Sequence, residues 1–147
     1  TARSKEFSEV EGKKKAIEIL KNDGVDALIV LGGDGTFTGA RDMSNLCNGE
    51  INVIGVPATI DLDIACTEYT IGFDTAINTA MEGIDRIRDT STSHERCSIV
   101  EVMGRNAGYI AAYSGISTGA EEILIPEVNE FADINKIITR VRIALSV

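Results

Sequence analysis

An uninterrupted apolar run at residues 27–31 leads directly into Gly-Gly-Asp-Gly-Thr at residues 32–36, and this junction constrains the fold more than any other part of the sequence. A continuous apolar run of this length is typical of a parallel strand that is covered on both faces. A tight strand-to-helix turn would explain the glycines, which allow positive φ angles and close approach to a ligand, but a turn needs no carboxylate between them. Because Asp34 supplies that carboxylate, we predict a phosphate-and-metal loop at the carboxyl end of a strand, suited to a Mg-nucleotide.

The rest of the chain alternates helical and strand patterns. Ser8 and Glu11 have the spacing of a capping box, ahead of a helix that ends near Gly24. The longest amphipathic pattern predicts a helix that starts at Phe73 and continues to about Ile87. Further helices are expected over residues 36–46, 107–117 and 132–145, and further strands over residues 51–56, 98–103 and 122–125. This alternation predicts an α/β fold with a doubly wound, mostly parallel sheet and right-handed crossovers, in which ligands bind at the carboxyl ends of the strands.

Composition excludes several classes of function. The formal net charge is -9, and because no basic run offsets it, DNA or RNA binding is disfavoured. The sequence has no apolar stretch of membrane-spanning length and no signal-peptide pattern, so we expect a cytoplasmic protein without a membrane partner. Three separated cysteines and a single histidine argue against disulfide and zinc scaffolds. An acidic chain can still bind phosphorylated small molecules through a few arginines or Mg²⁺.

The second loop of unusual composition, at residues 57–63, places Asp61 and Asp63 two residues apart. We expect this segment to be extended, so that both carboxylates face the same side. Either aspartate could instead cap the following turn. Kinase chemistry requires one carboxylate to accept a hydroxyl proton and another to orient metal or polar groups. Asp61 is the better candidate base because Thr59, on the same side, can bind the same substrate.

The third loop, at residues 103–108, places Arg105 at a strand end just ahead of a helix. There the arginine could bind substrate, or it could be a solvated residue in a glycine turn. Arg96 precedes the same strand, so we expect it to reach a ligand only across a subunit interface. Glu101 falls in an apolar run where burial of an unpaired carboxylate is costly, and His94 is interpreted as a polar loop residue.

Four motifs, at residues 32–36, 59–63, 93–96 and 103–105, occur in the order found in the ATP-dependent 6-phosphofructokinase family. The chain resembles that family from near its N-terminus to about Glu127. The resemblance implies a phosphofructokinase-like fold. Residues 1–72 are then part of an ATP-binding domain and residues 73–147 part of a fructose 6-phosphate-binding domain. The resemblance also implies that the family's N-terminal glycine-rich nucleotide loop lies before Thr1, and that further sugar-binding residues lie beyond Val147.

The activity implied by the resemblance is phosphoryl transfer from MgATP to the 1-hydroxyl of fructose 6-phosphate, which gives fructose 1,6-bisphosphate in glycolysis. The implied ATP contacts are Gly33, Asp34, Gly35 and Thr36, with Asp34 also touching Mg²⁺. The implied sugar contacts are Thr59, Ile60, Asp61, Arg96, Met103, Gly104 and Arg105.

Within this set, Asp61 resembles the family's base, and Asp63 is a candidate second carboxylate. Arg96 resembles the arginine that this family lends to the sugar phosphate of a neighbouring subunit. Glu121 is similar to the effector-site carboxylate that helps to hold the metal of a nucleotide diphosphate. These similarities imply a homotetramer with a nucleotide effector bound between subunits.

Two positions bear on the phosphoryl donor. Pyrophosphate-using relatives typically have aspartate where this chain has Gly35, and lysine where it has Ala58. An aspartate at position 35 would crowd and repel the α-phosphate of a nucleotide, so ATP is the expected donor. The chain departs from the family at Leu62, where asparagine is usual, and at Ala58, where glycine is common. Leu62 removes hydrogen-bonding capacity between two aspartates.

Other functions stay open at the level of sequence. Lipid and NAD kinases also carry Gly-Gly-Asp-Gly-Thr, but they do not continue with the loops at residues 59–63 and 103–105. A pyrophosphate-dependent phosphofructokinase is a further alternative. The chain could also be a non-catalytic segment that only binds nucleotide or assembles with other subunits.

Overall fold

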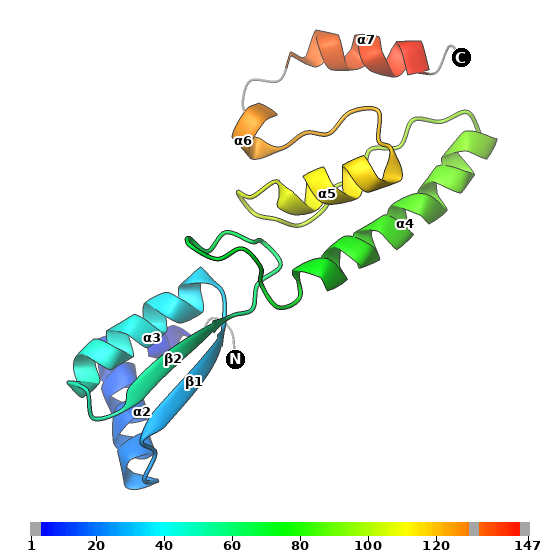
Figure 1. Cartoon of the computed structure of the whole chain (residues 1–147). Helices are drawn as coiled ribbons and strands as arrows, with labels where there is room; N and C mark the ends of the chain where they lie inside the picture. The colour runs from blue at the N-terminus through cyan, green and yellow to red at the C-terminus, as the bar shows by residue number, and fades with distance from the viewer. Residues whose placement is uncertain (1–3, 130–132, 145–147) are drawn as a thin grey trace. The chain divides into compact units, whose positions relative to one another are not determined.

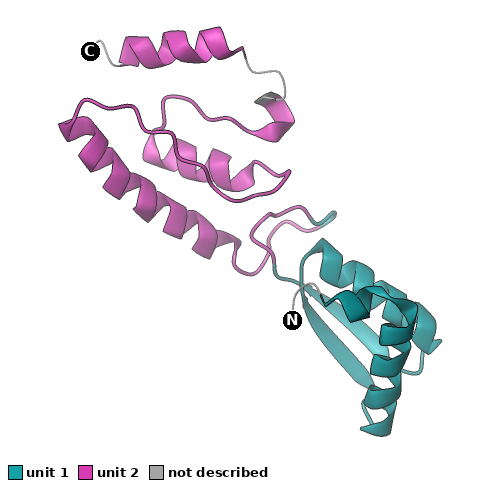
Figure 2. Cartoon of the chain, turned by 180° about the vertical axis from the view of Figure 1, so that it is seen from behind, with its two compact units in different colours: residues 1–58, 64–66 teal, residues 59–63, 67–147 magenta. Residues whose placement is uncertain are grey.

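A computed structural model of the chain describes residues 4–129 and 133–144. The chain forms two compact units, which are coloured separately in Figure 2. Unit 1 consists of residues 1–58 and 64–66, and unit 2 consists of residues 59–63 and 67–147. No helix within the described ranges combines the length and the apolar character needed to cross a membrane.

Unit 1 is a small α/β layer structure (Figure 1). Its elements are α1 (Lys5–Ser8), α2 (Val10–Asn22), β1 (Ala27–Gly32), α3 (Asp34–Cys47) and β2 (Asn52–Pro57). The two strands are parallel and in register from Ala27 opposite Asn52 to Gly32 opposite Pro57. The predicted strand, glycine loop, helix and strand over residues 27–56 are therefore confirmed.

The core of unit 1 lies on one face of this two-stranded sheet. Ile17 of α2 packs with Met43 and Cys47 of α3 and with Ile51, which precedes β2. Figure 1 shows α2 and α3 on the same side of the strands. The opposite face carries the side chains of Ile29, Leu31 and Ile54, which are 62%, 61% and 56% exposed.

The expectation that the strand at residues 27–31 is covered on both faces is therefore wrong for the described residues. Residues of β1 alternate between exposed and half-buried along the strand, because the helices contact only one of its faces.

The predicted capping box is also wrong. Ser8 lies at the end of the short helix α1, and its hydroxyl donates to the carbonyl of Lys5 at 2.5 Å. Glu9 occupies the N-cap of α2 in an extended conformation. The hydroxyl cannot cap α2 because it is already used within the preceding turn.

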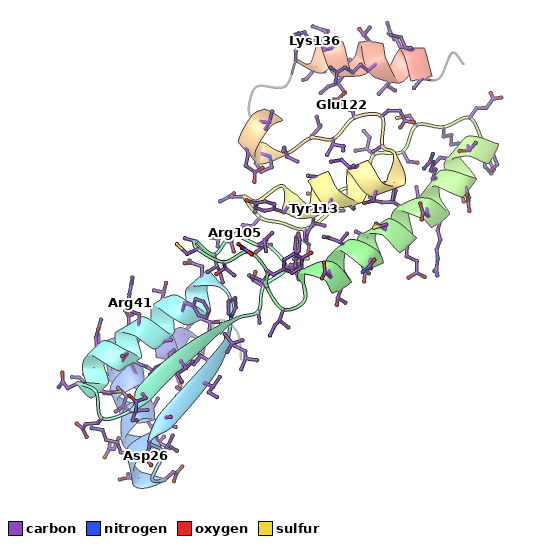
Figure 3. The ribbon with its side chains drawn as sticks, viewed as in Figure 1. Asp26, Arg41, Arg105, Tyr113, Glu122 and Lys136 are labelled. Atoms are coloured by element: carbon purple, nitrogen blue, oxygen red, sulfur yellow. The ribbon has the colours of Figure 1, made fainter. Side chains whose placement is uncertain are left out.

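Unit 2 is helical in its regular elements. These are α4 (Phe73–Ser93), α5 (Tyr109–Thr118), α6 (Pro126–Asn129) and α7 (Ile134–Ala144). The helices expected from residues 73, 107 and 132 onward are confirmed, with residues 132 and 145 outside the described ranges. Arg140 of α7 donates to the carboxylate of Glu122 at 2.5 Å, and Glu122 is labelled below α7 in Figure 3.

The strands expected at residues 98–103 and 122–125 are absent from the described structure. A strand requires hydrogen bonds to a neighbouring strand, and the sheet in the described part of the chain contains β1 and β2 alone. Ile99 is accordingly 96% exposed. Glu101 is exposed as well, so the cost of burying an unpaired carboxylate does not arise there.

The core of unit 2 is a cluster of three buried side chains, Phe73 and Ile77 of α4 and Ile110 of α5, which we call the α4–α5 cluster. Partly buried apolar side chains pack against it, namely Ile60, Leu62, Ala76, Ala80, Met81 and Val102. The α4–α5 cluster thus collects side chains from two loops as well as from two helices.

Aromatic and polar contacts extend around this cluster. The ring of Phe73 makes edge-to-face contacts with Tyr69 and Tyr113, at centroid distances of 6.1 Å and 5.6 Å. At the other end of α5, the guanidinium of Arg88 donates to the carbonyl of Thr118.

Candidate functional site

The glycine loop ends at the N-terminus of α3. Gly33 is the N-cap, in an extended conformation with φ −97° and ψ −163°, and Asp34, Gly35 and Thr36 form the first turn. The first N–H groups of a helix lack intrahelical partners, and Gly33 has no side chain to cap them. A 14-residue helix also carries a partial positive charge at this end. The local chemistry therefore suits an anion such as a phosphate.

Glycine is required beside this helix end by close packing. A Cβ atom at Gly32 would lie 2.3 Å from Oγ1 of Thr36, so the threonine side chain can sit over the strand end only because residue 32 has none. A Cβ atom at Gly35 would meet no atom of the described residues within 4 Å. The space in front of Gly35 is therefore open among the described residues.

Asp34 is the candidate metal ligand. It is exposed in the first turn of α3, and its carboxylate makes no hydrogen bond or ion pair with any described residue. No group of three or more His, Cys, Asp or Glu side chains in the described ranges could hold a metal ion by itself. A lone carboxylate still fits Mg²⁺, because this ion is usually bound through one or two carboxylates together with substrate phosphates and water.

The loop at residues 59–63 is held by two hydrogen bonds. The hydroxyl of Thr70, a residue only 6% exposed, donates to the carbonyl of Thr59 at 2.7 Å. The N–H of Asp61 donates to Oγ1 of Thr59 at 3.2 Å. Asp61 is half-buried and Asp63 is exposed.

The expectation of an extended segment at residues 59–63 is wrong at Leu62, which has φ 55°. A left-handed residue interrupts the alternation of side chains on which the shared face of Asp61 and Asp63 depended. Leu62 packs instead against the α4–α5 cluster.

The loop at residues 103–108 forms a tight turn ahead of α5. The N–H of Ala107 donates to the carbonyl of Gly104 at 2.7 Å, Gly104 has φ 154°, and Arg105 has φ 54°. Arg105 is exposed, and Figure 3 labels it in this loop. Met103, which precedes the turn, is 76% exposed.

A carboxylate supports the same loop. The N–H of Gly108, the N-cap of α5, donates to Oε1 of Glu127 at 2.7 Å. The supporting roles of Glu127 and Thr70 are not predicted by the sequence. Their partners lie 19 and 11 residues away in the chain, and no local pattern signals such contacts.

Arg96 and Glu121 lie in exposed connections of unit 2. The N–H of Arg96 donates to the carbonyl of Ser91 at 2.9 Å in the turn that ends α4, where Glu95 has φ 51°. The side chains of Arg96 and Glu121 make no hydrogen bond or ion pair within the described residues. Both are free to meet a ligand or another subunit.

The structure brings two of the predicted loops to one hydrophobic cluster. Leu62, next to Asp61, and Val102, next to Met103, both pack against the α4–α5 cluster. The glycine loop before α3 belongs to unit 1.

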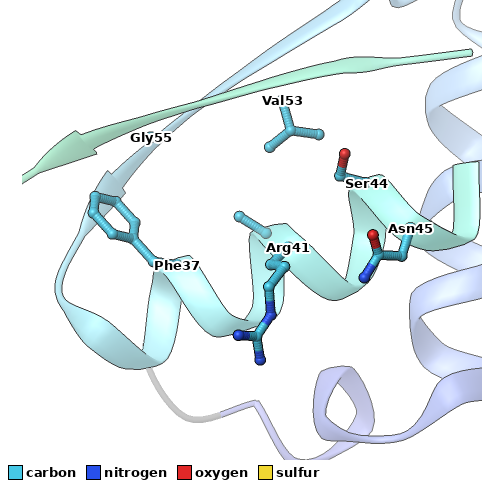
Figure 4. Close-up of a pocket in the computed structure, with 7 residues that line it drawn as sticks. Phe37, Arg41, Ser44, Asn45, Val53 and Gly55 are labelled. Atoms are coloured by element: carbon cyan, nitrogen blue, oxygen red, sulfur yellow. The ribbon is translucent and has the colours of Figure 1, made fainter. Parts of the chain in front are cut away.

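An open groove in unit 1 lies between α3 and β2 (Figure 4). Phe37 and Arg41 of α3 and Val53 and Gly55 of β2 are among its lining residues. The Phe37 ring lies against Gly55, where a Cβ atom would be 2.9 Å from the ring. None of the predicted site residues lines this groove.

Comparison with known families decides the identity. The family model described as Phosphofructokinase matches residues 1–145. The chain belongs to the phosphofructokinase family. The resemblance inferred from the four motifs is therefore confirmed, as is the phosphofructokinase-like α/β fold class.

Curated phosphofructokinases are identical to this chain at more than half of the aligned positions. The ATP-dependent 6-phosphofructokinase of Thermoanaerobacter sp. (strain X514) is 59% identical over 128 residues, which are 87% of this chain and 39% of that protein. That of Clostridium tetani (strain Massachusetts / E88) is 56% identical over 137 residues, which are 93% of this chain and 41% of that protein. The chain spans about two fifths of the length of these curated relatives.

Solved phosphofructokinases share the fold. Phosphofructokinase from Saccharomyces cerevisiae matches 86% of this chain and 19% of its own, with a TM-score of 0.79 and 38% identity. Pichia pastoris phosphofructokinase in the T-state matches 82% of this chain and 14% of its own, with a TM-score of 0.74 and 37% identity.

Proposed function

We propose that the protein transfers a phosphoryl group from ATP to the 1-hydroxyl of fructose 6-phosphate, giving fructose 1,6-bisphosphate. The observation that carries this proposal is the Gly-Gly-Asp-Gly-Thr loop at the N-terminus of a 14-residue helix in a chain of the phosphofructokinase family. The relatives named above are ATP-dependent 6-phosphofructokinases, which supports ATP as the donor and glycolysis as the setting.

In this proposal, ATP binds at the N-terminus of α3. Gly33 and Gly35 let the backbone N–H groups approach the phosphates, and Thr36 adds a hydroxyl. Asp34 would hold Mg²⁺, which neutralises charge on the phosphates during transfer when it is bound. The open space at Gly35 favours a nucleotide over pyrophosphate as the donor.

Asp61 is the proposed base, which accepts the proton of the sugar hydroxyl as that oxygen attacks the phosphorus atom. The hydrogen bonds around Thr59 and Thr70 support this role because they fix the backbone on both sides of Ile60. Asp63 is proposed as a second carboxylate that orients polar groups.

The remaining sugar contacts are Thr59 and Ile60 with Met103, Gly104 and Arg105. Arg105 would bind an anionic group of the sugar phosphate with its planar guanidinium. The tight turn at residues 104–107 supports this assignment, since it fixes the backbone that carries the arginine.

We further propose the assembly that the family resemblance implies. Residues 1–72 belong to the ATP-binding domain and residues 73–147 to the fructose 6-phosphate-binding domain of a cytoplasmic homotetramer. Arg96 serves the sugar phosphate of a neighbouring subunit, and Glu121 binds the metal of a nucleotide effector. The exposure of both side chains supports these roles.

The test is Asp61→Asn in the full-length protein that carries this chain, with Asp85→Asn on the exposed face of α4 as the matched control. Initial rates are measured with ATP and fructose 6-phosphate by coupled detection of ADP. We expect kcat to fall by about 100-fold or more for Asp61→Asn, as for loss of a positioned base, and to be unchanged for the control. Near-normal turnover by Asp61→Asn would refute the base assignment.

Equilibrium dialysis with ATP, and rates with pyrophosphate followed by release of phosphate, separate the proposal from its alternatives. A protein that binds ATP in equilibrium dialysis but does not turn over fructose 6-phosphate supports the non-catalytic alternative. Turnover with pyrophosphate but not with ATP would reverse the donor assignment.

A further inference from the structure

Leu62 has an unusual backbone conformation. Its φ angle of 55° lies in the left-handed region, which asparagine and glycine occupy readily and leucine rarely. The residue directly follows Asp61. Strained backbone conformations cluster at active sites, where the surrounding structure holds them in place.

The strain is held in place by contacts on both sides of the loop. The side chains of Ile60 and Leu62 both pack against the α4–α5 cluster, so Asp61 is flanked by two apolar anchors. Upstream, the carbonyl of Thr59 is fixed by the hydroxyl of Thr70, and Oγ1 of Thr59 receives the N–H of Asp61.

The direction of the chain after Asp61 therefore depends on the left-handed turn. In an extended chain, residues 61 and 63 would point to the same side, but the turn at residue 62 interrupts this pattern. Asp61 is half-buried, whereas Asp63 is exposed. The backbone at position 62 thus separates the surroundings of the two carboxylates.

We propose that Leu62 is a positioning residue whose left-handed backbone aims the carboxylate of Asp61. This inference rests on the proposed function, in which Asp61 is the base. The important property of position 62 is access to positive φ, and the apolar side chain is secondary. Residues that take up this conformation easily sustain turnover, whereas residues that resist it do not.

Two substitutions separate this proposal from ordinary packing. Leu62→Ile keeps the volume and apolar character of the side chain, but a β-branched residue strongly resists positive φ. Leu62→Asn loses the apolar contact but accepts the left-handed conformation. If Leu62 only filled the α4–α5 cluster, isoleucine would be the mild change and asparagine the damaging one. The positioning role predicts the reverse order.

The experiment measures kcat and KM for fructose 6-phosphate in the full-length protein that carries this chain. We expect Leu62→Asn to keep kcat within about threefold of the unmodified protein. We expect Leu62→Ile to lower kcat by about tenfold to 100-fold, the range that misplacement of a reacting group by about 1 Å can cause. Leu124→Ala, at a half-exposed leucine of the same unit, is the control and should leave kcat unchanged.

A double-mutant cycle shows whether position 62 acts through Asp61. In the Asp61→Asn background, Leu62→Ile should cost less than about twofold in kcat, because residue 62 no longer has a carboxylate to aim. The proposal is overturned if Leu62→Ile turns over as fast as Leu62→Asn, or if it costs as much in the Asp61→Asn background as in the unmodified protein.

The outcomes also distinguish this inference from the proposed function. Full turnover by Asp61→Asn removes the base assignment and the positioning role together. Loss of turnover in Asp61→Asn, with equal kcat in the two Leu62 variants, removes the positioning role alone. Urea unfolding of each variant identifies any loss of kcat that comes from a failure to fold. If Leu62→Ile does not fold, the kcat of Leu62→Asn decides: retained turnover supports the positioning role, and lost turnover overturns it.

Discussion

Replacement of Gly104 by alanine tests the geometry of the loop that carries Arg105. The new methyl carbon would lie 2.3 Å from the backbone carbonyl oxygen of Ala107, and the residue would have to keep a φ angle of 154°. The oxygen belongs to the backbone of a turn closed by the 2.7 Å hydrogen bond from Ala107 to Gly104, so it cannot move aside without breaking that turn.

The expected loss of stability follows from these two terms. A side chain held in a sparsely populated backbone region costs about 1 to 3 kcal/mol, and loss of the turn's hydrogen bond costs about 1 kcal/mol more. We therefore expect Gly104→Ala to lower the free energy of unfolding of unit 2 by about 3 kcal/mol, which is roughly a 100-fold change in the unfolding equilibrium.

Gly83→Ala is the matched control, because it is the same substitution in the same unit. Gly83 is exposed in α4, and a Cβ atom there meets no other described residue within 4 Å. Alanine is favoured over glycine inside a helix by about 1 kcal/mol, so this variant should gain stability.

The assay is urea unfolding followed by tyrosine fluorescence. The chain has no tryptophan, and its three tyrosines, Tyr69, Tyr109 and Tyr113, all lie in unit 2, so the signal reports that unit. At a slope of about 2 kcal/mol per molar urea, Gly104→Ala should lower the midpoint by about 1.5 M and Gly83→Ala should raise it by about 0.5 M. An unchanged midpoint for Gly104→Ala would show that the turn at residues 104–107 is not part of the folded state.

Two further predictions concern titratable pairs. Lys13, which is only 8% exposed, donates to Asp42 at 2.6 Å, and this hydrogen bond lowers the pKa of Asp42 below its ordinary value of 3.8. A lowered pKa contributes stability that is fully present above pH 3.8 and is lost as the pH falls through the folded-state value. The urea midpoint measured by far-UV circular dichroism should therefore drop between pH 5 and pH 3, and the drop should be smaller for Asp42→Asn. Identical pH profiles for the two proteins would contradict this prediction. The hydrogen bond that Tyr69 donates to Asp74 raises the pKa of Tyr69 above its ordinary value of 10.0, and the negative charge of Asp74 adds a smaller effect in the same direction. Asp74→Asn should therefore lower the pKa of Tyr69 in an ultraviolet titration, with Tyr69→Phe identifying the affected transition, and an unchanged or higher pKa would count against the hydrogen bond.

The local elements of this protein follow from its sequence. The apolar run at residues 27–31 and the glycines after it predict β1 and the start of α3, because strand and turn preferences act over a few neighbouring residues. The helix from Phe73 follows from apolar residues at three- and four-residue spacing, although the structure carries it on to Ser93. The four motifs were also sufficient to identify the family.

Pairing and burial were less predictable. The apolar patterns at residues 98–103 and 122–125 resemble strands, but a strand is stable only with a hydrogen-bonded neighbour, and its presence is not a local property. The same limit explains the uncovered face of β1, since a continuous apolar run indicates that both faces can be buried and cannot specify what covers them.

The sequence by itself determined which residues are candidates for chemistry: a carboxylate among glycines at Asp34, a candidate base at Asp61 and an arginine in a glycine turn at Arg105. Only the tertiary structure decided how those residues are held. Leu62 and Glu127 reach their partners across 11 or more residues of chain, through packing on the α4–α5 cluster and through a hydrogen bond to the start of α5. Such contacts depend on where distant segments meet in space, which short-range preferences along the chain do not encode.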